Sequence, residues 1–196
     1  MNKIKIGLYF LIFLTAINLS AQGSRFNNYF ISSFGTGPSI PTSNFSNVYK
    51  LGLNFGLNGG YLFTKNIEAR LSLIYVYFPY KGTNSDITGG TLHDITVKGD
   101  LLYGIFANPK FNPYGILGLG EHFFYNSDLI VNGVSQSIES ESGFGVSIGV
   151  GLSYLLTPQF SIYGETQYNK VYTAGNSTNF YTVGAGVSYK WWSDRK

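Results

Sequence analysis

The chain has 196 residues, of which only 12% are charged and 17% are aromatic, and this balance is poor for a protein surface in water. A formal net charge of +3 provides no basic surface for nucleic acid, and the absence of cysteine excludes disulfides and thiolate chemistry. We therefore expect a protein whose outside faces lipid, with no nucleic-acid partner.

The N-terminus has the pattern of a secretory signal peptide. Two lysines precede an apolar run from Ile6 to Ile17, and small residues surround Ala21. With these flanks the run is too short for a spanning helix, although a retained membrane anchor is the alternative. We expect residues 1–21 to be removed near Ala21 and residues 22–196 to form one domain. Loss of the two lysines leaves 11 basic residues against 10 acidic ones, a net charge of +1.

The stretch from Phe144 to Tyr154 carries the fold prediction. Every second residue is large and apolar, and every residue between is glycine or serine, so the period of two indicates a β-strand. A bulky apolar face opposite a face of small residues favours a barrel in lipid, because the bulky side meets acyl chains and the small side leaves room in a narrow lumen. After residue 22 no apolar run approaches the length of a membrane helix.

Similar segments elsewhere bring the number of predicted strands to eight. They are Asn27–Thr36, Leu51–Phe63, Ile67–Tyr77, Ile95–Ala107, Phe111–Tyr125, Phe144–Tyr154, Phe160–Tyr172 and Phe180–Trp192. The inside–outside phase of the first strand stays open. In the fifth strand Leu117, Leu119 and Glu121 share one face, and a β-bulge would resolve that mixture.

The predicted strands are joined alternately by short turns and long polar loops, the pattern of outer-membrane barrels with turns in the periplasm and loops outside the cell. The short turns lie near Lys65, Pro109 and Pro158, and the long loops lie near Pro41, Asp86, Gly133 and Asn176. We expect all six prolines in connections or at strand ends, since proline cannot donate to a ladder. The segment Leu129–Val134 predicts a hairpin extension with an Asn-Gly turn.

Aromatic residues on the bulky faces are predicted to gather near both ends of the strands, as they do at the two interfaces of a membrane barrel. The outer girdle would consist of Tyr75, Tyr77, Tyr168 and Tyr181, and the periplasmic girdle of Phe63, Tyr154, Tyr189 and Trp191.

The last predicted strand contains a glycine followed by spaced aromatic residues, Gly186, Tyr189 and Trp191. This resembles the C-terminal insertion signal of bacterial outer-membrane proteins. From about Phe26 to Trp192 the chain resembles the small OmpA/OmpX-type β-barrels, more particularly the outer membrane β-barrel domain common in Bacteroidetes. The resemblance implies a place in the bacterial outer membrane, contact with its lipid, and insertion by the barrel-assembly machinery through the last strand.

Charged residues on the small faces form a candidate site inside the barrel. They are Glu68, Arg70, Lys98, Asp100, Glu165 and Lys190, with Gln167 on the same face. An eight-stranded barrel is only wide enough to be filled by its side chains, so we expect these charges to pair as a structural plug. A small gated path for water or ions is the alternative.

The two imidazoles, His93 and His122, give no catalytic or metal pattern. Neither is followed by a nucleophile at the spacing used by membrane-embedded lipid hydrolases, and no cysteine lies nearby. We expect no catalysis, no metal and no cofactor, and a lipid-modifying enzyme is the third function considered.

The predicted outer loops are rich in Asn, Ser, Thr, Gly and Tyr, which suits either a surface ligand or protein, or solvated loops without a partner. The sequence therefore predicts an all-β protein, an eight-stranded antiparallel up-and-down transmembrane β-barrel. Its expected role is structural or surface interaction, with a porin-like channel for ions or small solutes as the alternative. A soluble β-barrel is the other fold considered, and the outward apolar band argues against it.

Overall fold

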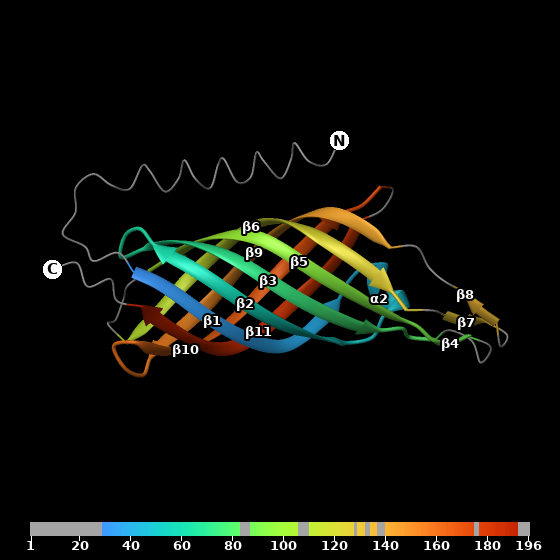
Figure 1. Cartoon of the computed structure of the whole chain (residues 1–196), viewed down its shortest axis with the longest axis horizontal. Helices are drawn as coiled ribbons and strands as arrows, with labels where there is room; N and C mark the ends of the chain where they lie inside the picture. Colours follow the sequence, from blue (N-terminus) through green and yellow to red (C-terminus); the bar gives the residue numbers. More distant parts are fainter. Residues whose placement is uncertain are drawn as a thin grey trace.

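The computed structural model describes residues 29–82, 87–105, 110–127, 129–131, 134–136, 140–174 and 177–191. Eight strands close into one barrel in the cyclic order β1-β11-β10-β9-β6-β5-β3-β2, and every neighbouring pair is antiparallel (Figure 1). This confirms the predicted fold class. The barrel strands are β1 (Tyr29–Pro41), β2 (Gly52–Leu62), β3 (Ile67–Pro79), β5 (Thr91–Gly104), β6 (Phe111–Asn126), β9 (Glu141–Leu155), β10 (Phe160–Tyr172) and β11 (Ser177–Trp191).

The two ends of the barrel differ in what connects the strands. One end, called here the turn end, carries the β2–β3, β5–β6 and β9–β10 connections and the described chain ends, where Phe30 pairs with Trp191. The opposite loop end carries the helix α2 (Phe45–Val48) and the short strands β4 (Ile87–Gly89), β7 (Leu129–Val131) and β8 (Val134–Gln136) (Figure 1). This asymmetry agrees with the predicted alternation of short turns and long loops, except near Asn176. The expected long loop there is wrong, because β10 extends to Tyr172 and β11 already begins at Ser177, so residues 173–176 alone connect them.

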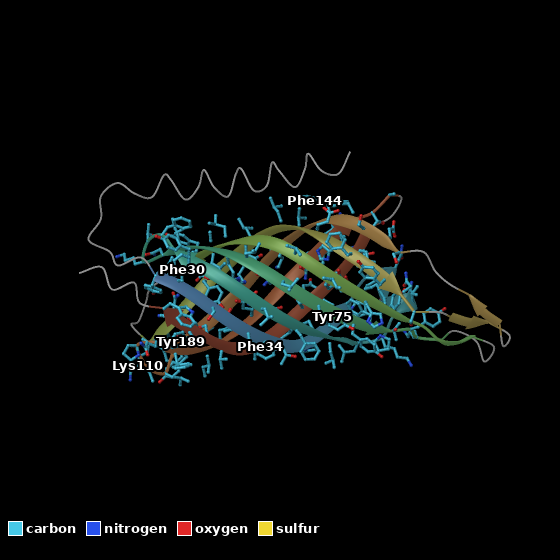
Figure 2. All side chains as sticks on the ribbon, viewed as in Figure 1. Phe30, Phe34, Tyr75, Lys110, Phe144 and Tyr189 are labelled. Carbon is cyan, nitrogen blue, oxygen red and sulfur yellow. The ribbon has the colours of Figure 1, made fainter. Side chains whose placement is uncertain are left out.

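The predicted faces are confirmed along the strand that carried the fold prediction. In β9, Ile148 and Val150 are exposed on the outside, while Ser147, next to Ile148, is buried on the lumen side. The open phase of β1 is also settled, because Phe30 and Phe34 project outward and Gly35 is buried (Figure 2). The outside of the barrel is therefore apolar, as alternation with a bulky outer face requires.

The ambiguous strand β6 contains no bulge. Its register with both neighbours runs without a skipped residue, so Leu117, Leu119 and Glu121 all lie on the outer side and His122 lies on the lumen side. The sequence was ambiguous because Glu121 places a carboxylate on the apolar face. Glu121 lies in the loop-end half of β6, five residues before the strand ends at Asn126.

Strand β5 begins at Thr91, before the predicted start at Ile95, and ends at Gly104 rather than Ala107, which lies outside the described residues. The predicted loop therefore loses His93 and Asp94 to the strand. The physical reason is pairing with the end of β3, where Pro79 lies opposite Thr91, together with burial of Leu92 on the lumen side.

The expectation that no proline lies inside a strand is wrong for Pro38 in β1 and Pro113 in β6. Around Pro38 the β1–β11 register skips Gly37 and Pro38, although pairing with β2 continues through both residues. The side-chain amide of Asn54 fills this gap, donating to the carbonyl oxygens of Gly37 at 2.9 Å, Pro38 at 3.0 Å and Val183 at 3.2 Å. A side chain thus supplies hydrogen bonds that the ladder lacks there.

At the loop end, β7 pairs with β8 and Val131 lies opposite Val134, which confirms the pairing expected over Leu129–Val134, while the expected Asn-Gly turn lies outside the described residues. Pairing of β4 with β7, and the helix α2, were not predicted. Among the described residues no helix has both the length and the apolar character needed to cross a membrane. The predicted leader, Asn27 and Trp192 lie outside the described residues.

Candidate functional site: the barrel lumen

A buried ion pair crosses the middle of the lumen. The guanidinium of Arg70 on β3 donates to both carboxylate oxygens of Glu165 on β10, at 2.6 and 3.1 Å. These two strands stand opposite each other in the cyclic strand order. The Nε atom of Arg70 also lies 3.4 Å from Asp100 Oδ2, and the relative exposures of Arg70 and Asp100 are 5% and 3%.

A second cation completes this arrangement. The ammonium of Lys98 on β5 lies 3.1 Å from Asp100 Oδ1 and donates to Gln167 and to the hydroxyl of Ser147. Ser72 donates to the other oxygen of Asp100 at 2.7 Å. Both oxygens of Asp100 therefore face a positive or donating group.

Glu165 is satisfied in the same way, accepting hydrogen bonds from the Tyr114 hydroxyl at 2.8 Å and from the Gln167 amide at 3.1 Å. The ionic network, defined here as Arg70, Lys98, Asp100 and Glu165, balances two cations with two anions. Such a network stands in a low-dielectric interior only because each charge has a partner. Removing one partner typically costs about 3–5 kcal/mol.

Glu68 and Lys190, which the sequence placed with these charges, face a different space. They form no salt bridge within the described residues, and both line a cavity of about 110 Å³ between the ionic network and the turn end. Lys190 Nζ lies 5.4 Å from the centre of the Tyr29 ring. This turn-end cavity is also lined by Arg70 and Glu165, so it reaches the ionic network from the turn-end side.

The lumen near the loop end is filled by apolar side chains. Phe78 and Phe180 are fully or almost fully buried, with ring centres 5.4 Å apart. Phe45 of α2 packs edge-on against Phe78 at 5.0 Å, so the helix covers these rings. The loop-end cluster is defined here as Val76, Phe78, Leu92, Phe124, Val171 and Phe180.

Sequence reasoning missed this cluster because it expected small or polar residues on every lumen face. A signal was present, however. At the loop ends of β3, β6 and β10 both faces are bulky, as in the run Tyr77–Phe78 and the run Phe123–Phe124. Loss of alternation at one end of several strands indicates a lumen closed by apolar side chains there.

A buried histidine lies beneath the loop-end cluster. His122 Nδ1 lies 2.8 Å from Asp94 Oδ2 and 2.8 Å from the Thr96 hydroxyl, and its ring stacks on Phe124 with centres 6.0 Å apart. In a nucleophilic triad the acid and the nucleophile contact different imidazole nitrogens, whereas here both contact Nδ1. The arrangement holds the imidazole in place and does not activate the Thr96 hydroxyl.

The other histidine lies on the opposite side of the barrel wall. His93 projects outward between Tyr75 and Tyr77, and its Nδ1 lies 2.6 Å from the Tyr75 hydroxyl. The two imidazoles are therefore not brought together. The described residues contain no group of three or more histidine or acidic side chains placed to hold a metal ion.

The residues of the two expected girdles all lie on the outer surface. Tyr168 and Tyr181 contact each other near the loop end with ring centres 5.0 Å apart, and Tyr189 and Trp191 do so near the turn end at 4.8 Å. The remaining members, Tyr75, Tyr77, Phe63 and Tyr154, are exposed or half-buried on the outer face. Gly186 of the expected insertion signal faces the lumen, where the Tyr163 ring and the β1 backbone occupy the space of a side chain.

A closed eight-stranded antiparallel barrel with an apolar outside, aromatic ends and paired charges within belongs to the class of small membrane-spanning β-barrels. The family model for the outer membrane protein beta-barrel domain matches residues 10–190. The chain therefore belongs to that family.

Comparison with solved structures finds the same fold. Neisserial surface protein A (NspA) aligns with a TM-score of 0.61 at 15% identity, covering 83% of this chain and 97% of that one. Ail, the attachment invasion locus protein of Yersinia pestis, solved in complex with the heparin analogue sucrose octasulfate, aligns with a TM-score of 0.61 at 20% identity, covering 85% and 100%. OprG of Pseudomonas aeruginosa aligns with a TM-score of 0.52 at 17% identity, covering 87% and 99%. The search of curated proteins gives no match.

Proposed function

We propose that this protein is a non-conducting outer-membrane barrel that presents its loop end to the cell exterior, for structural support or surface contact. The observation that carries the proposal is the loop-end cluster. Its rings occupy the lumen and are covered by α2, so the entrance on that side is closed by apolar packing.

Closure at two levels supports a sealed lumen. An ion entering from the loop end would first have to displace Phe78 and Phe180, and it would then meet the Arg70–Glu165 pair that crosses the barrel. An eight-stranded barrel has an interior just wide enough for side chains to fill, so neither barrier can be bypassed through spare space. The ionic network acts in this proposal as a polar plug.

A small channel is the second candidate, and one observation favours it. The turn-end cavity of about 110 Å³ already reaches Arg70 and Glu165. A continuous path through the lumen would then require two further openings, one in the ionic network and one in the loop-end cluster. Movement of α2 with Phe45 would be the necessary first step, because this helix covers the loop-end cluster.

Contact with a surface partner is part of the proposal and rests on the loop end. The short strands β4, β7 and β8 extend beyond the barrel there, which provides surface for recognition (Figure 1). Ail, whose fold this chain shares, has been solved with a heparin analogue, so a barrel of this shape can bind a ligand. No catalytic step is proposed, because His122 is buried and holds both of its partners on one nitrogen.

Export and insertion belong to the same proposal. A leader cleaved near Ala21 would deliver the chain across the inner membrane. The assembly machinery would then recognise β11 through Gly186, Tyr189 and Trp191, and lipid would contact the two aromatic girdles.

Single-channel recording in a planar bilayer tests the sealed lumen. The refolded wild-type protein should insert without conductance steps, whereas Phe78→Ala combined with Phe180→Ala and Arg70→Ala should give steps. Phe30→Ala combined with Phe34→Ala and Leu57→Ala, a triple truncation on the outer face, is the matched control and should stay silent. Steady, ion-selective steps from the wild-type protein would contradict the proposal and favour the channel.

A further inference from the structure

The outer surface of the barrel contains a groove of about 740 Å³ that crosses five strands, from β3 through β5, β6 and β9 to β10. Its walls are mostly leucine, valine and isoleucine side chains, including Leu101, Leu119 and Ile148, and Tyr168 also lines it. Arg70 and Asp100 also border it, but their side chains are buried on the lumen side. The groove is therefore apolar and lies in the lipid-facing wall of the barrel.

The register explains how the sequence makes this groove. Gly99 on β5 lies opposite Leu119 on β6, which lies opposite Val146 on β9, which lies opposite Lys170 on β10. Gly99 has no side chain to fill this row, and a Cβ atom added there would meet no atom within 4 Å. The missing side chain leaves a notch among large neighbours, and Ala69 leaves a smaller one at the β3 end.

The groove also climbs across the wall. Ala69 lies two residues from the turn-end start of β3, whereas Lys170 lies two residues from the loop-end terminus of β10. Four steps between adjacent strands at about 4.8 Å give a length of about 19 Å. One leaflet accounts for about half of a hydrocarbon core of about 30 Å, so the groove is long enough for one acyl chain of the loop-end leaflet.

Lys170 places a positive charge at the end of this groove that is nearer the loop end of the barrel. Its side chain is on the outer face, with Nζ 5.2 Å from the centre of the Tyr172 ring. Among the described residues no carboxylate forms a salt bridge with it. An ammonium on a lipid-facing surface is costly unless it reaches a polar partner at the headgroup level, and an anionic headgroup supplies that partner.

We propose that this groove is a binding site for an anionic lipid, with one acyl chain lying over Gly99 and the phosphate of its headgroup on Lys170. The site is independent of the lumen and goes beyond the function proposed above, because it would exist in a sealed or a conducting barrel. It assigns roles to Gly99 and Lys170, the two positions on the row that are not aliphatic side chains.

Native mass spectrometry of the refolded protein tests the proposal, using release from detergent micelles that contain equal amounts of phosphatidylglycerol and phosphatidylcholine with identical acyl chains. The wild-type protein should retain phosphatidylglycerol at least 5-fold over phosphatidylcholine. Gly99→Leu should lower total retained lipid at least 5-fold by filling the notch. Lys170→Gln should leave lipid bound but bring the ratio of the two lipids close to one.

Gly59→Leu is the matched control, since Gly59 is also outward with no atom within 4 Å of an added Cβ, but it does not line the groove. It should retain lipid like the wild-type protein. Heat-dependent gel mobility reports whether each variant has folded, and Gly99→Val replaces Gly99→Leu if the larger side chain prevents refolding.

Equal retention of the two lipids by the wild-type protein would overturn the proposal. So would equal losses in the Gly99 and Gly59 variants, or a lipid-free dimer, which would assign the groove to a second copy of the chain.

Discussion

The two halves of the lumen are enclosed by the same eight strands but are filled by opposite chemistry. Toward the loop end, aromatic and branched side chains pack without a space or a charge between Phe78 and Phe180. Toward the turn end, Glu68 and Lys190 border a cavity. The ionic network lies between the two halves, where Arg70, Lys98 and Asp100 are buried and Glu165 borders the cavity. The comparison teaches that position along the barrel axis decides what a lumen side chain contributes to stability.

The largest effect is expected at the centre. Arg70→Ala should lower the free energy of unfolding by about 3–5 kcal/mol, because Glu165 would lose the cation that it pairs with and Asp100 would keep only Lys98 of its two cationic partners. Urea unfolding of the barrel in lipid vesicles measures this loss. Arg70→Met with Glu165→Leu removes both charges and should recover much of it. If Arg70→Ala unfolds like the wild-type protein, the four charges are not coupled.

The second-largest effect on the free energy of unfolding is expected in the loop-end half. Phe78→Ala removes a fully buried ring and should cost about 3 kcal/mol, the low end for such truncations, because α2 can settle toward the void. The same urea titration measures this loss. Phe34→Ala, a ring on the outer face, is the control (Figure 2). An equal loss for both variants would mean that the loop-end cluster is not tightly packed.

A smaller effect is expected at the boundary between the loop-end cluster and the ionic network. Asp94→Asn removes the charge from a hydrogen bond to His122 while preserving the shape of the site. Charged hydrogen bonds contribute about 1.5–3 kcal/mol, so a loss of about 2 kcal/mol is expected. Nitrogen-15 NMR of His122 would show a changed tautomer or proton position in the variant. An unchanged His122 signal would show that Asp94 does not fix the imidazole.

The smallest effect is expected in the turn-end half. Lys190→Gln should change the free energy of unfolding by less than about 1 kcal/mol, because its ammonium faces a space that water can enter and belongs to no salt bridge in the described chain. Lys98→Gln makes the same chemical change within the ionic network and should cost several times more. Similar costs for the two lysine variants would erase the distinction between the centre and the turn end.

Strand number, the faces of most strands and the four of the six expected lumen charges that pair could be predicted from the sequence because each depends on a period of two. That period is unclear in the first and fifth strands, so their faces could not be predicted. Arg70, Lys98, Asp100 and Glu165 follow directly from alternation, since all four occupy the small face of their strands. The Asp94–His122 contact escaped prediction because it needs the register between β5 and β6, and because Asp94 was placed in a loop.

Other features depend on contacts that no local pattern carries. The helix α2 is only four residues long, which is too short to show a helical period in the sequence. It is held in place by contacts of Phe45 with rings from β3 and β11. Pro38 was expected outside a strand because its missing N–H breaks a ladder. The compensating amide comes from Asn54 on the neighbouring strand, which only the folded barrel brings close.

The hydrogen bonds of Asn54 have a consequence for how the barrel is closed. The β1–β11 seam joins residues near opposite ends of the chain, with Phe30 opposite Trp191, so it closes the longest loop of any pairing in the barrel. Its ladder is continuous from the turn end as far as Thr36 and resumes at Ser39. The Asn54 amide bonds to Pro38 on β1 and to Val183 on β11, so pairing of the two end strands across this gap depends on a residue of β2 as well as on the seam itself.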